Sequence, residues 1–289
     1  MQNLKNLLEQ ATTQLAASSK TPRLDAELLL GYILQKDRVY LFSHPEYDLS
    51  FQEHQQWRHL LSQRCLQIPV AYLIGQKYFW NLDLQVNQHT LIPRPETELL
   101  VELVLCRGDR LVAQGDAVNV LDLGTGSGAI ALALAHERPN WKISAVDFSE
   151  DALKIAKINA AKNNIFNVEF FHSDWFSTFV NDEKWDVIVS NPPYLDENDA
   201  HLITEEIRHE PREALVSKKN GLADFEKIIA DARYYFKPGG QIFLEHGCAQ
   251  GEAVRELFLL HGYGSVETSR DLAGLERVTW GVVSEVLAR

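Results

Sequence analysis

The chain has 289 residues, 45% of them hydrophobic and 24% charged, which is ordinary for a globular protein with one or two cores. Its net charge of −12 is uneven, because residues 1–90 carry 8 basic and 8 acidic side chains whereas residues 91–289 carry 20 and 32. A broad acidic surface argues against direct binding of nucleic acid, since phosphate contacts need lysine and arginine.

Signals for a membrane, a disulfide framework or a metal are absent from the sequence. No run reaches the apolar length of a membrane span, and the N-terminus is amphipathic without the apolar core of a signal peptide. The three cysteines, Cys65, Cys106 and Cys248, are widely separated and lack metal-ligand spacing. We therefore expect a cytoplasmic protein without metal and without membrane contact.

Residues 1–75 have the pattern of a small helical bundle. Thr21-Pro22 has the form of an N-cap followed by proline, and Ser50 with Glu53 forms a capping-box pattern. Apolar residues recur at helical spacing in the segments concerned, namely Leu4, Leu7, Leu8, Ala11 and Leu15, then Leu24, Leu28, Leu29 and Ile33. We expect a separate N-terminal helical domain.

The pattern changes after residue 75. Alternating apolar residues predict a hairpin across 76–93 that links the helical domain to a second domain, 94–289. The second domain begins with a stiff proline-bounded loop, Ile92-Pro93-Arg94-Pro95-Glu96-Thr97-Glu98, and an apolar helix follows it.

Strand and helix patterns alternate from residue 118 onward, which predicts an α/β fold with a parallel, doubly wound sheet. The expected strands are Val118–Leu123, Ile143–Asp147, Val168–Phe171, Val187–Ser190 and Gln241–Glu245, with an antiparallel edge hairpin from Gly264–Thr268 and Val278–Val283. The expected helices between the strands are Ala129–Glu137, Asp151–Asn163 and Ala223–Phe236.

The first of these strands ends in Asp122-Leu123-Gly124-Thr125-Gly126-Ser127-Gly128. Alternate glycines let the backbone turn sharply and approach a ligand, and the following helix offers free N–H groups. The spacing also satisfies the relaxed dinucleotide fingerprint, which keeps a nicotinamide cofactor as an alternative. The Asp122 carboxylate argues for another ligand, because it would repel a pyrophosphate and attract a cationic amino-acid group.

Asp147 ends the second strand, 19 residues after Gly128, where a carboxylate can accept hydrogen bonds from both hydroxyls of a ribose. S-adenosylmethionine has a ribose and an ammonium group but no phosphate, so it suits both acids. After the third strand, Asp174 can accept from an adenine amino group and Trp175 can cover the ring. A structural role stays open for each of these acids and for the tryptophan. Asp122 is then a strand-end cap, Asp147 a helix N-terminal acid, Asp174 an N-cap and Trp175 a core aromatic.

Asn191-Pro192-Pro193-Tyr194 follows the fourth strand and forms a rigid clamp. The Asn191 side-chain oxygen and the Pro192 carbonyl can each accept a hydrogen bond from a target NH2 group, and the prolines stiffen the backbone. Tyr194 can stack on a flat target. If the sheet order reverses between the first and fourth strands, the clamp meets the glycine loop, which predicts methyl transfer to a planar nitrogen.

With both motifs, the chain resembles the class I S-adenosylmethionine-dependent methyltransferases and, within them, the HemK/PrmC family. The resemblance spans the whole chain and rests on the proline-bounded loop, the glycine loop, the Asn-Pro-Pro-Tyr clamp and Leu244-Glu245-His246-Gly247. It implies a Rossmann-like domain with a mostly parallel seven-stranded sheet. The implied reaction methylates the side-chain amide N5 of the glutamine in the Gly-Gly-Gln motif of peptide chain release factors and leaves S-adenosylhomocysteine.

The resemblance also implies which residues act. The helical domain would contact the release factor, and segment 196–220 receives no assigned contact. The cofactor would touch Gly124, Thr125, Gly126, Ser127, Gly128, Asp147, Trp175 and Asn191, to which the residue arguments add Asp122 and Asp174. The glutamine would lie against Asn191, Pro192, Pro193 and Tyr194, with Arg94 and Glu96 walling the pocket.

Three other functions stay open on the sequence. An adenine-N6 methyltransferase acting on DNA or RNA would use the same clamp, but it would need basic grooves and a way to flip the base. A nicotinamide-dependent oxidoreductase fits the glycine spacing alone. A non-catalytic module that binds release factors would keep the fold without the reaction. A monomer is sufficient for a two-domain enzyme.

Overall fold

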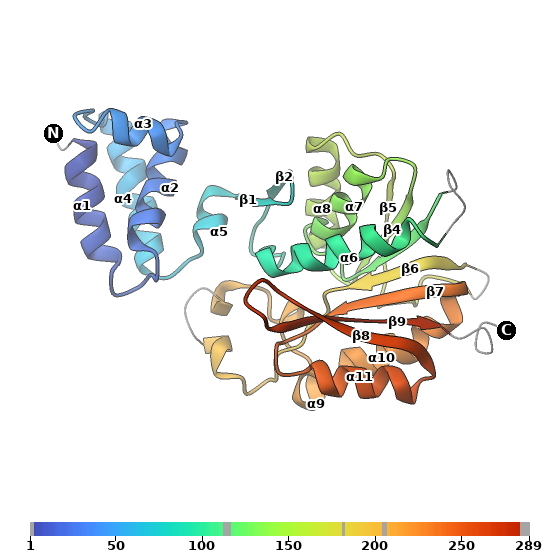
Figure 1. Ribbon diagram of the computed structural model, residues 1–289. Coiled ribbons are helices and arrows are strands. Elements are labelled where there is room, and N and C mark those ends of the chain that lie inside the picture. Colours follow the sequence, from blue (N-terminus) through green and yellow to red (C-terminus); the bar gives the residue numbers. More distant parts are fainter. Residues whose placement is uncertain (1–2, 112–116, 181–182, 204–206, 284–289) are drawn as a thin grey trace. The chain divides into compact units, whose positions relative to one another are not determined.

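The computed structural model describes residues 3–111, 117–180, 183–203 and 207–283 (Figure 1). The ends of the two expected domain ranges, residues 1–2 and 284–289, lie outside the described residues, as do 204–206 within segment 196–220. The chain divides into two compact units, Met1–Gln76 with Ala200–His209 and Lys77–Asp199 with Glu210–Arg289. A short segment from the C-terminal half therefore belongs to the helical unit.

The helical unit is built around leucines. Its helices are α1 (Leu4–Leu15), α2 (Pro22–Leu34), α3 (Arg38–Ser43), α4 (Phe51–Cys65) and α5 (Val70–Ile74). All the predicted apolar residues of α1 are buried, and Ser50 and Glu53 form a complete capping box on α4. On α2 the buried stripe is Ala26, Leu29 and Leu30, whereas Leu24 and Leu28 lie on its exposed side.

A buried ion pair crosses the core of this unit. Arg64 on α4 donates to Asp25 on α2 at 2.7 Å, and both side chains are almost fully buried. The hydroxyls of Ser19 and Thr21 donate to the same carboxylate. Thr21 is the N-cap residue of α2 and Pro22 is its first helical residue, as predicted. The Thr21 hydroxyl, however, donates to the Asp25 carboxylate and forms no side-chain cap on α2.

The second unit begins within β1 (Gln76–Phe79), at Lys77, and β1 forms a hairpin with β2 (Leu82–Gln85). Residues 86–93 form a turn and irregular backbone, closed by the hydrogen bond from Thr90 N–H to the Asn87 carbonyl at 3.0 Å. The 3-10 turn η1 (Pro95–Thr97) then leads into α6 (Glu98–Gly108). The hairpin therefore ends at Gln85 and not at residue 93 as expected.

The sheet of the second unit has seven strands in the order β5-β4-β3-β6-β7-β9-β8. The strands β3 to β7 are parallel and the β8–β9 edge is antiparallel, which confirms the predicted fold class. Their bounds are β3 (Asn119–Leu123), β4 (Lys142–Asp147), β5 (Val168–His172), β6 (Trp185–Ser190), β7 (Phe236–Glu245), β8 (Tyr263–Arg270) and β9 (Glu276–Val283). Because β6 pairs directly with β3, the order reverses between them.

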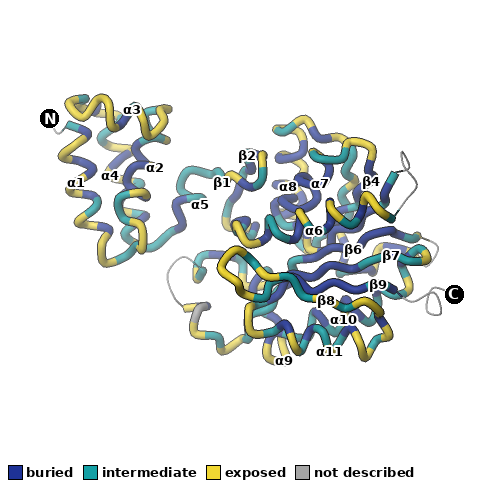
Figure 2. Tube along the Cα trace, in the orientation of Figure 1, coloured by how far each residue is buried: buried dark blue, intermediate teal, exposed yellow. Residues whose placement is uncertain are grey.

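Helices cover both faces of this sheet (Figure 1). One face carries α6, α7 (Ala129–Glu137) and α8 (Glu150–Lys162), and the other carries α10 (Ala223–Ala232) and α11 (Gly251–Leu260). Successive residues of a strand point to opposite faces of the sheet. On β6, Val187 packs into the core on one face and Ile188 into the core on the other. The central strands are therefore buried on both sides, as Figure 2 shows for β6 and β7.

Candidate functional site

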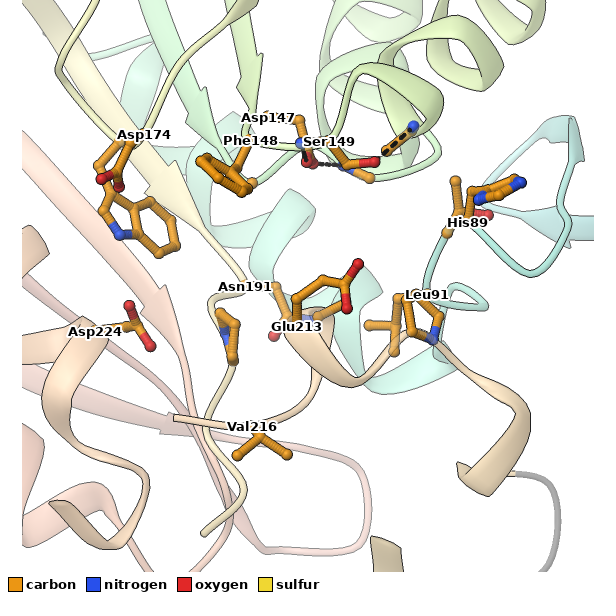
Figure 3. Close-up of a pocket in the computed structure, with 18 of the residues that line it drawn as sticks. His89, Leu91, Asp147, Phe148, Ser149, Asp174, Asn191, Glu213, Val216 and Asp224 are labelled. Atoms are coloured by element: carbon orange, nitrogen blue, oxygen red, sulfur yellow. Dashed lines mark hydrogen bonds between the residues drawn. The ribbon is translucent and has the colours of Figure 1, made fainter. Parts of the chain in front are cut away.

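The carboxyl ends of β3, β4 and β6 and the loop after β5 open into one cavity of about 410 Å³ (Figure 3). This volume is within the usual range of small-molecule sites, and its place beside the order reversal is where open α/β sheets bind ligands. Leu123 on β3 pairs in register with Ser190 on β6, so the glycine loop and the Asn-Pro-Pro-Tyr clamp start from adjacent backbone positions. The structure thus brings the two motifs together.

The glycine loop has the backbone conformation that its sequence predicts. Gly124, Gly126 and Gly128 all have positive φ values, of +71°, +56° and +86°. A Cβ on Gly126 would meet no heavy atom within 4 Å, and this residue lines the cavity with Gly124. A Cβ on Gly128 would lie only 2.9 Å from Leu132, so this glycine permits packing of α7 instead.

Asp147 is held rigidly at the end of β4. Its two carboxylate oxygens accept hydrogen bonds from the N–H groups of Gly126 and Ser149, both at 2.8 Å, and the residue lines the cavity. Burial raises its pKa, while these backbone hydrogen bonds act in the opposite direction. The side chain of Ser149 caps α8, so Asp147 is not the helix cap and keeps acceptor capacity towards the cavity.

Asp122 lies beneath the glycine loop. It is fully buried, does not line the cavity, and accepts a hydrogen bond from the Thr125 hydroxyl at 2.7 Å. Burial raises the pKa of this carboxyl to about 7, against the lowering effect of that hydroxyl. This geometry favours the strand-end cap over contact with a ligand. Thr125, Ser127 and Gly128 also lie outside the cavity lining.

Aromatic rings flank the glycine loop. Trp175 has a left-handed backbone with φ of +53°, and its carbonyl accepts from the Ser173 hydroxyl at 2.8 Å. Its ring lies 3.6 Å from the point that a Cβ on Gly124 would occupy. Phe148 lies beside Asp147 and is 71% exposed, an unusual state for a large apolar side chain (Figure 3). Asp174 lines the cavity and pairs with Lys227 at 2.8 Å.

Hydrogen bonds to other elements hold the clamp in place. Asn191 and Pro193 line the cavity, and the Asn191 amide nitrogen donates to the Thr97 hydroxyl oxygen at 3.3 Å. The Tyr194 carbonyl accepts from the Gln250 side-chain amide at 3.0 Å, and burial raises the pKa of the Tyr194 phenol. Pro192 is buried, and neither it nor Tyr194 belongs to the cavity lining.

Arg94 and Glu96 do not line the cavity. Arg94 forms an ion pair with Glu210, which also accepts from the Ile92 N–H at 3.0 Å, and Glu96 is exposed. The cavity wall comes instead from two loops that the sequence did not identify. They contribute His89, Thr90 and Leu91, and Pro211, Glu213, Ala214 and Val216.

The lining of the cavity is acidic. Asp147, Asp174, Glu213 and Asp224 all contribute to it, and Asn191 and Glu213 lie across the cavity from Phe148 and Asp147 (Figure 3). Such a lining favours a positively charged ligand. With the open backbone at Gly126, the ring of Trp175 and the rigid Asp147 carboxylate, the residues present fit S-adenosylmethionine. Within the described ranges, no group of His, Cys, Asp or Glu side chains could hold a metal ion.

Comparisons with known proteins agree with this geometry. A profile described as a methyltransferase domain matches residues 114–272, and one described as the PrmC N-terminal domain matches residues 6–75. A methyltransferase of known structure from Pyrococcus furiosus aligns over 77% of this chain and 99% of its own, with a TM-score of 0.53 at 19% identity. A 16S rRNA methyltransferase from T. thermophilus, solved with AdoMet and guanosine, aligns over 72% of this chain and 49% of its own, with a TM-score of 0.50 at 20% identity. These two likenesses show the fold.

Sequence relatives show the family. The release factor glutamine methyltransferase of Salmonella typhimurium is 47% identical over 279 residues, which are 96% of this chain and 98% of the relative. That of Escherichia coli K12 is 46% identical over 274 residues, which are 95% of this chain and 96% of the relative. The resemblance seen in the sequence is therefore confirmed, and the chain belongs to the family of release factor glutamine methyltransferases.

Proposed function

We propose that the chain transfers a methyl group from S-adenosylmethionine to the amide N5 of the glutamine in the Gly-Gly-Gln motif of peptide chain release factors. One observation carries the proposal: Asn191, the acceptor for a target amide, lines the same cavity as Asp147 and the glycine loop. The names of the relatives support the release factor as the substrate.

The cofactor half of the cavity would bind by three kinds of contact. Asp147 would accept hydrogen bonds from the ribose hydroxyls, the backbone at Gly124 and Gly126 would allow close approach, and Trp175 would cover the adenine ring. S-adenosylmethionine, when bound, supplies a methyl group on a positively charged sulfur, which the acidic lining of the cavity would favour.

The clamp would orient the target nitrogen. An amide nitrogen is a poor nucleophile because its lone pair is delocalised, so the Asn191 oxygen and the Pro192 carbonyl would hold the NH2 group in line for transfer. Orientation of this kind supplies at most about 7–11 kcal/mol of the barrier. Tyr194 would stack on the flat amide group; like Pro192, it is outside the cavity lining, so this contact would form only with the substrate bound. No general base is needed before transfer, because the proton can leave afterwards.

The partner would be the release factor itself, contacted by the helical unit, with the chain acting as a monomer in the cytoplasm. No helix in the described part of the chain is long and apolar enough to cross a membrane. The adenine-N6 alternative is less favoured, because the lining is acidic where a nucleic-acid substrate would bring phosphates.

Mass spectrometry of a Gly-Gly-Gln-containing release factor tests this function. After incubation with the enzyme and S-adenosylmethionine, the glutamine should gain one methyl group. Asn191→Ala should lower the turnover number by about a hundredfold or more, as loss of one preorganised polar group does in other enzymes, while the unfolding midpoint stays near wild type.

Asn140→Ala is the matched control, because Asn140 is exposed and does not line the cavity. Near-normal turnover by the Asn191 variant would refute the role of the clamp. Methylation of nucleic acid in the absence of any release factor would instead favour the adenine-N6 alternative.

A further inference from the structure

Glu245 is a buried acid that the proposed reaction leaves without a role. It is the last residue of β7, and its side chain is 2% exposed. β6 and β7 are parallel, with Ser190 opposite Leu244, so Asn191 and Glu245 are the next residues of the two strands at the same sheet edge. One of the two carboxylate oxygens, Oε2, has no hydrogen-bond partner among the described residues.

Two side chains approach this carboxylate from the clamp side. Burial, the largest effect, raises the pKa of Glu245 to about 7, whereas the nearby Thr97 and Asn191 side chains lower it. Arg277 also lowers the pKa of Glu245, and Glu96 raises it. The adjacent His246 bonds elsewhere, to the Thr279 hydroxyl at 2.9 Å, and so does not compete for the clamp.

These contacts decide which way the Asn191 amide points. Its nitrogen donates to the Thr97 hydroxyl oxygen at 3.3 Å, which leaves the Thr97 O–H free to donate onward to the carboxylate. Above about pH 7, where Glu245 is ionised, its carboxylate can only accept hydrogen bonds, so a flipped amide would place its oxygen against the acid. The flipped arrangement is repulsive, and the favoured one turns the Asn191 oxygen towards the cavity.

We propose that Glu245 is a positioning residue that, together with Thr97, holds the Asn191 amide in the orientation that accepts the target NH2 group. This inference rests on the proposed function, since it explains how the clamp presents its acceptor. Glu245 does not line the cavity and acts through Asn191 alone. Thr97→Val, which removes the hydroxyl and keeps the shape, should have the same kind of effect as a change at Glu245.

The first test is Glu245→Gln, assayed with a release factor and S-adenosylmethionine. A glutamine can donate as well as accept, so it tolerates both amide orientations. We expect the turnover number to fall about tenfold while the cofactor dissociation constant, measured by calorimetry, stays within about twofold. The unfolding midpoint should be unchanged or higher, because a buried carboxylate is replaced by a neutral group.

Glu276→Gln is the matched control. Glu276 lies on the neighbouring strand β9, pairs with Arg255 and Arg270 and does not line the cavity, so this variant should keep wild-type turnover. Turnover by Glu245→Gln within twofold of wild type would overturn the proposal. A fall in turnover matched by a fall in the unfolding midpoint would also overturn it, because it would indicate a purely structural role.

A reciprocal exchange tests the pairing itself. Asn191→Asp should be nearly inactive, because it sets two carboxylates against each other. When Glu245→Gln is added to Asn191→Asp, the glutamine NH2 group at position 245 can donate to the aspartate carboxylate at position 191. The double variant should therefore have at least about tenfold higher turnover than Asn191→Asp alone. A double variant no better than the worse single variant would contradict the proposal.

One readout is independent of the reaction. The side-chain NH2 resonances of Asn191, assigned by their loss in Asn191→Asp, should exchange slowly with solvent in the wild type and faster in Glu245→Gln. Equal exchange rates would refute the positioning role, whatever the activity. If the wild type leaves the release factor unmethylated but shows the expected exchange, then the proposed function fails and the anchoring of Asn191 stands.

Discussion

Two acids at neighbouring strand ends, Asp147 and Asp122, face different surroundings because the loop gives them different hydrogen-bond partners. Asp147 and Asp122 both follow the expected pattern of a strand-end carboxylate, but only Asp147 lines the cavity. The difference arises in the loop, where the Thr125 hydroxyl bonds Asp122 and the N–H groups of Gly126 and Ser149 bond Asp147. Such local partners follow from the folded path of the backbone, which the sequence pattern does not specify.

The loop residues of the cavity wall could not be predicted for a similar reason. Glu213 lies in a segment without periodic apolar residues, three residues after Glu210, which is paired with Arg94. That pair joins positions far apart in the sequence. Phe148 is the one missed residue with a visible signal, since a large apolar side chain directly follows the acid that ends β4.

Asp147→Ala should weaken cofactor binding. The change removes a charged acceptor of the ribose hydroxyls, and hydrogen bonds to charged groups are worth about 1.5–3 kcal/mol, which corresponds to roughly 10–100-fold in the dissociation constant for S-adenosylmethionine. Calorimetric titration measures this directly. Asp151→Ala, an exposed acid on the first turn of α8 outside the cavity lining, should leave the affinity unchanged. Unchanged affinity in the Asp147 variant would remove the ribose role.

Asp122→Asn should change how stability depends on pH. Burial raises the pKa of Asp122 from 3.8 to about 7, so the folded state binds this proton more tightly than the unfolded state does. The stabilisation is fully present below about pH 4 and is lost as the pH rises through about 7. One unit of pKa shift corresponds to about 1.4 kcal/mol, so the asparagine variant should gain a few kcal/mol on wild type over this range.

Urea denaturation at several pH values measures that difference. The comparison must be between the two proteins at each pH, because Glu245 and Asp147 also have raised pKa values and contribute a slope of the same sign in both. A constant gap between the variant and the wild type from pH 4 to pH 7 would contradict the burial argument.

Elements that bury a continuous apolar run were the most predictable. Six of the seven strands of the sheet coincide with expected runs to within two residues, whereas β7 starts at Phe236, five residues before the expected Gln241. The helix α7 matches its predicted bounds Ala129–Glu137, and Gly128 begins it with a left-handed backbone. The expected helix Ala223–Phe236 instead ends at Ala232, since Phe236 pairs with Trp185 at the start of β7. The helix α11 was not predicted, although Val254 and Phe258 have helical spacing.

Asn159 connects three elements, and its loss should affect both stability and cofactor binding. From the buried face of α8 it donates to the carbonyls of Gln85 on β2 and Ser127 in the glycine loop, at 2.9 and 2.8 Å, and accepts from the Gln85 N–H at 2.6 Å. Asn159→Ala leaves buried backbone groups unpaired, each at a cost of about 1–3 kcal/mol. We expect a lower unfolding midpoint and weaker binding of S-adenosylmethionine.

Asn163→Ala separates these two effects. Asn163 lies one turn further along α8 and bonds the backbone of Asp83 in the same hairpin, without contact to the glycine loop. It should lose stability while keeping the cofactor affinity of the wild type. If both variants weakened binding equally, the hairpin rather than the Ser127 contact would control the shape of the glycine loop.

At the scale of the whole molecule, the chain forms two units, each with its own hydrophobic core. The helical unit is made of two separate stretches of the sequence. The leucine core of α1 to α5 and the two cores of the sheet involve different residues. Ala200–His209 belongs to the helical unit, where Arg208 and His209 reach the Leu66 carbonyl at 2.8 and 3.2 Å. Residues 1–75 could be recognised as helical from their spacing, but nothing in the pattern of 200–209 indicated this membership.

Arg64→Ala tests this division by hydrogen exchange with mass spectrometry. Removing Arg64 leaves Asp25 as an uncompensated charge in the helical core, which typically costs about 3–5 kcal/mol. Peptides from α1 to α5 should take up deuterium faster, and peptides covering Ala200–Ile203 and Ile207–His209 should change with them. Peptides from β3 to β7 should keep wild-type protection, because they belong to other cores. Arg138→Ala, which removes an exposed ion pair with Asp109, should alter neither group. If segment 200–209 instead kept its protection while α1 to α5 lost theirs, it would belong energetically to the sheet unit.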